Sequence, residues 1–71
     1  MKVIEFLERF YPENRDRFIF KQNGETLLDE VYPFPIDEIP EVYQRIIETD
    51  FYRITIEPID DNVVITLYLE M

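Results

Sequence analysis

The stretch YRITIEPIDDNVVITLYLEM, residues 52–71, contains two runs of β-branched and aromatic residues around the polar segment PIDDN. Such runs, separated by a short turn sequence, are typical of a β-hairpin. A four-residue loop of residues 59–62 gives a register with one entirely apolar face, whose pairs are Pro58–Val63, Ile56–Ile65, Ile54–Leu67 and Tyr52–Leu69. Because a slip of one residue would exchange the two faces, we expect this register to be strongly specified.

The other face of this hairpin is predicted to be mixed and half wet. In this register Thr55 faces Thr66, and Arg53 faces Tyr68, where we expect a contact between the cation and the ring. The whole face is built from Phe51, Arg53, Thr55, Glu57, Val64, Thr66 and Tyr68. The hairpin therefore predicts a sheet with one buried face and one open face.

Two segments have the spacing of amphipathic helices. Residues 2–11 carry an apolar stripe that ends before Pro12, and its members are Val3, Phe6, Leu7 and Phe10, widened by Ile4 and Tyr11. In the second segment the stripe consists of Ile39, Val42, Tyr43, Ile46 and Ile47. We expect Asp37 to be the N-cap of this second helix, and Pro40 to lie in its first turn.

A second hairpin is predicted between the two helices, in RFIFKQNGETLL, residues 17–28. Asn23-Gly24 is the preferred sequence of a type I′ turn, and it places Phe20 opposite Leu27 and Ile19 opposite Leu28. The alternative is that ETLLDEV, residues 25–31, forms a helical turn.

The segment YPFPIDEIP, residues 32–40, contains three of the five prolines. Pro33 and Pro35 predict an extended run that cannot join a central strand. Tyr32, Phe34 and Ile36 alternate with proline in this run. They either present a preformed binding edge to a partner or cover the end of the core, and the second is the commoner fate of aromatic residues in a small domain.

Together these elements use almost the whole chain, which predicts a single domain, residues 1–71, of the α+β class. We expect the element order α-β-β-α-β-β, with a mostly antiparallel sheet that carries both helices on one face.

The residue types that are missing restrict the chemistry of this domain. The chain has no His or Cys, and it also lacks Ser, so the usual metal ligands and nucleophile–base pairs are absent. Glu57, Asp60 and Asp61 raise the alternative of a hard-cation site, but the spacing of a calcium loop is missing, and Asp and Asn also suit a turn. We therefore expect no enzyme, no catalytic residues, no metal and no cofactor.

Charge is distributed unevenly along the chain. Residues 1–21 carry a net charge of +1, whereas residues 22–71 carry −10. This field repels nucleic acid, so NRDR, residues 14–17, is interpreted as a solvated loop and not as a phosphate contact. It would attract a basic protein surface, although acidity also keeps an apolar-rich domain soluble. No segment resembles a signal peptide or a membrane span, which favours the cytoplasm.

Two functions follow as hypotheses. The first is a small acidic protein-binding module that inhibits or regulates a partner with a basic surface. Its predicted partner-binding residues are Tyr32, Phe34, Asp37, Glu38, Asp60 and Asp61, with an aromatic anchor beside charges that lie on loops. The second is a structural or assembly module that self-associates through its sheet, for example as a homodimer.

Overall fold

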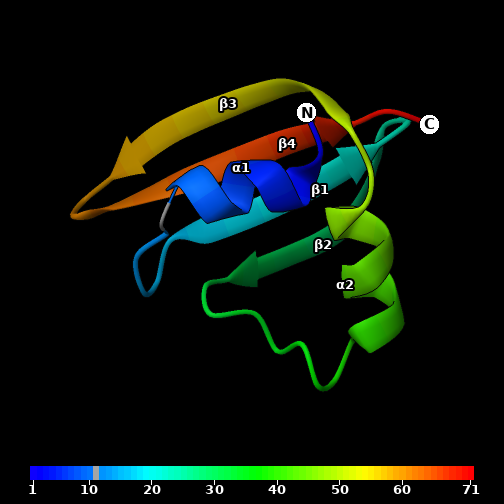
Figure 1. Cartoon of the computed structure of the whole chain (residues 1–71). Helices are drawn as coiled ribbons and strands as arrows, with labels where there is room; N and C mark the ends of the chain where they lie inside the picture. Colours follow the sequence, from blue (N-terminus) through cyan, green and yellow to red (C-terminus); the bar gives the residue numbers. More distant parts are fainter. Residues whose placement is uncertain (11) are drawn as a thin grey trace.

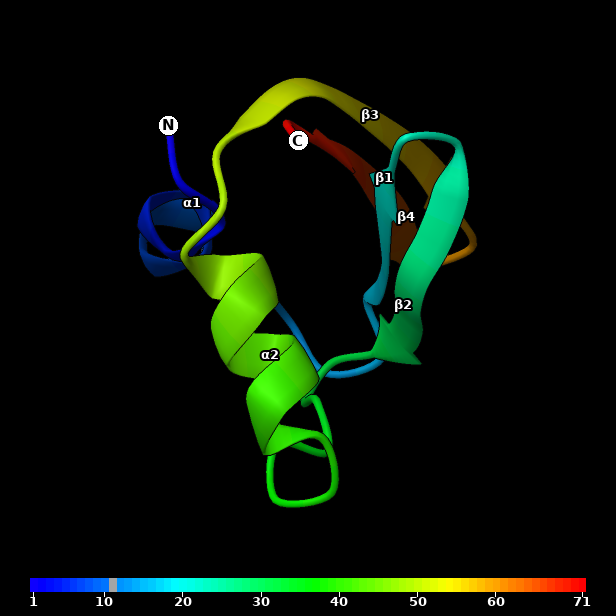
Figure 2. The ribbon, with the colours of Figure 1, turned by 90° about the vertical axis from the view of Figure 1, so that its right-hand side faces the viewer.

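The computed structural model describes residues 1–10 and 12–71. Its elements are α1 (Val3–Phe10), β1 (Arg17–Gln22), β2 (Glu25–Val31), α2 (Pro40–Ile47), β3 (Phe51–Ile59) and β4 (Asn62–Leu69). The strands form one sheet in the order β2-β1-β4-β3 (Figure 1). Both hairpins are antiparallel, and β1 runs parallel to β4 at the centre. Both helices lie on one face of the sheet (Figure 2), which confirms the predicted fold class and element order.

The core lies between the helices and the inward face of the central strands. Its buried hydrophobic residues are Val3, Phe18, Phe20, Phe34, Ile46, Ile65, Leu67 and Leu69. The α1 stripe adds Phe6, which packs edge-on against Phe10 and against Phe51 with ring centroids 5.2 and 5.7 Å apart. Tyr11, which the predicted helix included, lies outside the described residues.

The register of the β3–β4 hairpin agrees with the prediction from Arg53 to Pro58. At its open end a bulge pairs Phe51 with Leu69, so the predicted Tyr52–Leu69 pair and the outer position of Phe51 were wrong. Phe51 packs against the core and Tyr52 is 66% exposed. Burial favours this exchange because a phenylalanine ring has no hydroxyl group to desolvate. At the other end Ile59 pairs with Asn62, which leaves Asp60 and Asp61 alone in the turn.

The segment ETLLDEV is the strand β2 and not a helical turn. Asn23 and Gly24 adopt φ values of 55° and 83°, as a type I′ turn requires. A bulge after the turn places Phe20 opposite Leu28 and Ile19 opposite Asp29, so the predicted pairs were displaced by one residue. The bulge allows the adjacent residues Leu27 and Leu28 both to pack against the core.

The proline segment folds into successive turns and is not extended. The N–H of Ile36 donates to the carbonyl of Phe34 at 2.8 Å, and the N–H of Glu38 donates to the carbonyl of Pro35 at 2.9 Å. These turns place Ile39 at the N-cap of α2, without a side-chain hydrogen bond, so the prediction of Asp37 as N-cap was wrong. Pro40 occupies the start of the helix as expected, where its missing N–H costs no hydrogen bond.

Candidate partner-binding surface

The six predicted partner-binding residues lie in two separate places. Tyr32, Phe34, Asp37 and Glu38 belong to the connection between β2 and α2, whereas Asp60 and Asp61 form the tip of the β3–β4 hairpin. Figures 1 and 2 both show the hairpin tip well apart from the start of α2. The structure therefore does not gather the six residues into one site.

Phe34 is part of the core, with an exposed fraction of 8%. Its ring contacts those of Phe18, Tyr32, Phe20 and Tyr43 at centroid distances of 5.2, 5.6, 6.0 and 6.0 Å. Burial raises the pKa of Tyr43, and the neighbouring Tyr32 acts in the same direction. Phe34 and its aromatic neighbours thus cover the end of the core, and in this conformation Phe34 is not accessible to a partner.

Exposed apolar side chains lie in and just before the first turn of α2. Ile36 is 44% exposed and Val42 is 41% exposed, and the acidic residues between them in the sequence, Asp37, Glu38 and Glu41, are also exposed. We call these five residues the α2 entry surface. Glu38, Glu41 and Val42 line a shallow depression of about 290 Å³ together with Ile39 and Pro40. Val42 was predicted as core because it fits the helical spacing, but it lies at the margin of the stripe, and Ile46 is the buried residue of α2.

The hairpin tip has a different electrostatic environment. Asp60, with a φ of 55°, lies at a depression of about 420 Å³ that Arg15 and Arg17 also line. Exposed Val31 and Ile59 supply apolar surface there. The tip therefore combines acidic and basic groups, in contrast to the α2 entry surface.

Asp16 holds the loop before β1 in place, a role that the sequence did not indicate. This residue of the NRDR segment is only 5% exposed, whereas Arg15 and Arg17 are exposed as expected. Its carboxylate accepts hydrogen bonds from the N–H of Glu13 at 3.0 Å and from the N–H of Val63 at 3.3 Å. Its carbonyl accepts a hydrogen bond from the N–H of Tyr32 at 2.7 Å. Asp16 thus joins the loop before β1 to the end of β2 and to the start of β4.

Most of the acidic side chains lack a cationic partner. In residues 1–10 and 12–71 the structure contains two ion pairs, which use two of the sixteen acidic residues. Arg17 donates two hydrogen bonds to the carboxylate of Asp29, at 2.7 and 2.5 Å, and these bonds lower the pKa of Asp29. The second pair joins the N-terminal amine to Asp50 at 3.6 Å. The carboxylates of the α2 entry surface are therefore available to an external cation.

None of the described helices lies on the outward face of the sheet (Figure 2). On this face the guanidinium of Arg53 lies 5.3 Å from the centroid of the Tyr68 ring, which is the predicted contact. Tyr52 lies beside Tyr68, with ring centroids 6.3 Å apart. The pairing of Thr55 with Thr66 extends this face as expected, so it is mixed and partly exposed.

Within the described part of the chain, no group of three or more acidic, His or Cys residues is placed to hold a metal ion. None of the described helices has the length and apolar character needed to cross a membrane. Comparisons with protein-family models, with curated proteins and with solved structures find no match to this chain.

Proposed function

We propose that this chain is a small protein-binding module that inhibits or regulates a partner with a basic surface. The observation that carries the proposal is the α2 entry surface, where three exposed acidic residues and the exposed apolar residues Ile36 and Val42 all lie within residues 36–42. Charges of this kind increase the rate of encounter with an oppositely charged partner. Apolar side chains beside them supply the contact area that holds the complex together.

Ile36 and Val42 take the role of anchor that was predicted for Phe34 or Tyr32. Phe34 ties the turns that precede α2 to the core, because its ring packs against Tyr32 and Tyr43 and its carbonyl accepts the hydrogen bond from the N–H of Ile36. A net charge of −9 repels phosphate groups, so we propose a protein as the partner and not a nucleic acid. A chain without cysteine needs no oxidising compartment, and the cytoplasm is the proposed location.

The proposal is tested with two variants that change the charge equally at the two acidic places. In one, Asp37 and Glu38 are both changed to Lys, and in the other Asp60 and Asp61 are both changed to Lys. Each immobilised protein is exposed to lysate of the source organism at low and at high salt, and captured proteins are identified by mass spectrometry. Binding of each captured protein is then measured with purified components.

We expect the wild type to capture a basic protein, the first variant to lose it, and the second to retain it. High salt should weaken this capture because it screens the charges that steer the encounter. The proposal fails if the wild type captures nothing, or if both variants capture the same proteins with the same response to salt. Acidity would then serve solubility alone.

The second function predicted from the sequence, self-association through the sheet, concerns a different surface. A specific observation favours it, namely the charge pattern of the outermost strand, β3.

A further inference from the structure

The strand β3 contains a segment that is complementary to itself. Residues 53–57 read RITIE, so a basic and an acidic residue flank two isoleucines placed symmetrically about Thr55. When two such strands run antiparallel about Thr55, Arg53 faces Glu57 of the other copy, and Ile54 faces Ile56. Opposite charges and apolar residues placed directly across two strands stabilise their pairing.

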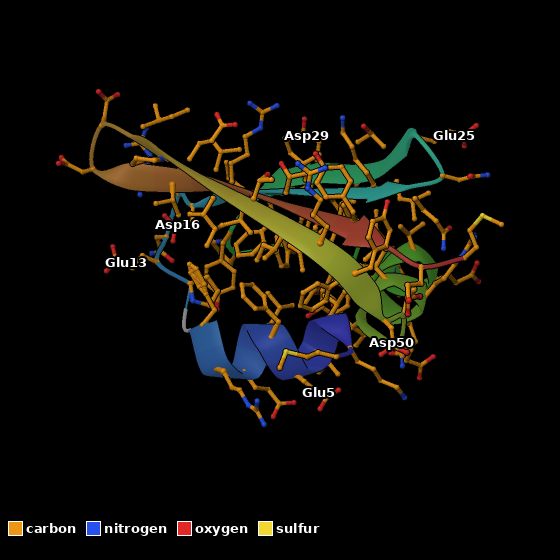
Figure 3. All side chains as sticks on the ribbon, turned by 90° about the horizontal axis from the view of Figure 1, so that it is seen from above. Glu5, Glu13, Asp16, Glu25, Asp29 and Asp50 are labelled. Atoms are coloured by element: carbon orange, nitrogen blue, oxygen red, sulfur yellow. The ribbon has the colours of Figure 1, made fainter. Side chains whose placement is uncertain are left out.

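The free edge of β3 is covered only at its beginning. β3 is the last strand of the sheet, and its other edge pairs with β4. At the beginning of β3 the N–H of Phe51 donates to the carbonyl of Met1 at 3.1 Å, and Lys2 forms a bridge with Asp50. Among the residues that the structure describes, none pairs with this edge beyond Phe51. Seen from above, β3 crosses in front of β4 (Figure 3).

The backbone groups at the free edge belong to the two isoleucines of this segment. Hydrogen-bonded and non-hydrogen-bonded pairs alternate along an antiparallel ladder, and in a two-residue hairpin the pair next to the turn is hydrogen-bonded. Here that pair is Ile59–Asn62. Thr55 and Glu57 therefore direct their N–H and C=O groups toward β4, whereas Ile54 and Ile56 direct theirs outward. Pro58 also faces outward but has no N–H to donate.

Several side chains at this edge are exposed, and its two charged residues have no ionic partner within the described residues. Ile56 lies opposite the buried Ile65, on the face that the helices cover elsewhere, yet it is 52% exposed. Arg53 and Glu57 are exposed on the other face, and neither forms an ion pair within the described residues. The five residues carry no net charge, although the chain as a whole carries −9. This segment therefore adds no net repulsion against a second copy.

We propose that two copies of this chain form a transient dimer by antiparallel pairing of their β3 edges about Thr55. Ile54 of each copy exchanges backbone hydrogen bonds with Ile56 of the other, and two Arg53–Glu57 pairs form on the outward face. A register centred on Ile56 would place Thr55 opposite Glu57 and Arg53 opposite Ile59, and so lose both ion pairs. A register centred on Ile54 would place Arg53 opposite Thr55 and lose both ion pairs. The α2 entry surface stays free, because the start of α2 lies well apart from the middle of β3 (Figures 1 and 2).

The charge pattern is tested by sedimentation equilibrium from about 10 µM to about 1 mM protein, the range in which a weak dimer dissociates. Salt of about 0.15 M reduces the repulsion between the acidic copies to short range. We expect the mean mass to rise from the monomer value of 8.7 kDa toward twice that value. Arg53→Glu or Glu57→Arg should each weaken association by at least about tenfold, because both pairs become repulsive.

The double variant Arg53→Glu with Glu57→Arg restores opposite charges across the interface, so it should associate within about threefold of the wild type. Arg45→Glu and Glu8→Arg are matched controls, because they make the same charge changes on the helices, where both residues are exposed. These controls should associate as the wild type does. Circular dichroism of each variant shows whether it is folded.

Hydrogen exchange followed by NMR tests the register directly. As the protein concentration rises, the amides of Ile54 and Ile56 should exchange more slowly, whereas those of Thr55 and Glu57 should be protected at every concentration. A monomer throughout this concentration range would overturn the proposal. So would a failure of the double variant to restore association, or protection that grows with concentration elsewhere but not at Ile54 and Ile56.

Discussion

Phe34→Ala is the substitution that separates the two roles of the proline segment. If Phe34 is a core residue, its truncation lowers the free energy of unfolding. If it mainly presents itself to a partner, truncation leaves the isolated domain nearly unchanged. Phe34 is 8% exposed and contacts four other rings, which predicts the first result.

The expected loss is large relative to the stability of the domain. Removal of a buried phenylalanine side chain costs about 3 to 5 kcal/mol. A domain of 71 residues has a free energy of unfolding of about 4 to 11 kcal/mol by the per-residue rule. Phe34→Ala should therefore leave a marginally folded protein. Phe34→Leu keeps most of the apolar volume and should cost less, about 1.5 kcal/mol.

The assay is urea unfolding followed by circular dichroism. A slope of about 1 kcal/mol/M, usual for the smallest domains, converts the expected loss into a midpoint lower by about 3 M or more. Ile36→Ala is the matched control, two residues along the same segment and 44% exposed, and should cost less than about 1 kcal/mol. Equal losses for Phe34→Ala and Ile36→Ala, or a loss below about 1 kcal/mol for Phe34→Ala, would refute the assignment of Phe34 to the core.

Two further predictions concern carboxylates. Asp16→Ala should lower the free energy of unfolding by about 1 to 3 kcal/mol, because it leaves the N–H groups of Glu13 and Val63 without an acceptor. The exposed Asp61→Ala should change it by less than about 0.5 kcal/mol in the same urea series, and equal effects would contradict the role of Asp16. The hydrogen bonds from Arg17 lower the pKa of Asp29, so the stability that this pair supplies is complete above the unfolded pKa, about 3.9. It is lost as pH falls through the lower folded pKa of Asp29. The difference in urea midpoint between wild type and Asp29→Asn should therefore shrink from about pH 6 to about pH 2, and a constant difference would contradict this account.

The elements of this fold were predictable because local signals agree with the tertiary pattern. The alternating residues of β3 and β4 fit one register on both faces, and the single glycine lies in the turn where φ is positive. The errors occur where the chain departs from regular geometry. A bulge exchanges Phe51 and Tyr52, and another displaces the pairs of Phe20. The position of a bulge depends on which of two neighbouring side chains gains more free energy from burial. The alternation of residues along the strand does not reveal that difference.

The candidate surface was only partly predictable from sequence. Asp37 and Glu38 lie exposed beside the start of α2, as expected for acidic loop residues. The exposure of Val42 depends on the rotation of α2 about its own axis relative to the core, which the sequence does not specify. Asp60 and Asp61 looked equivalent to that pair because both are acidic loops, and only the topology separates them. No pattern in the sequence indicated the burial of Asp16. Its carboxylate accepts hydrogen bonds from Glu13 and from Val63, and Val63 lies forty-seven residues further along the chain.

Acidity and the free edge of β3 constrain each other. An unpaired edge is a template for association with any other strand, and charge is one means by which proteins suppress it. A net charge of −9 repels a second copy in nearly every orientation. The segment from Arg53 to Glu57 carries no net charge. Its two charged residues face opposite charges of a second copy in one antiparallel register only. In the proposed dimer, the acidic surface therefore limits self-association to the pairing about Thr55. The same charge leaves the α2 entry surface available to a basic partner.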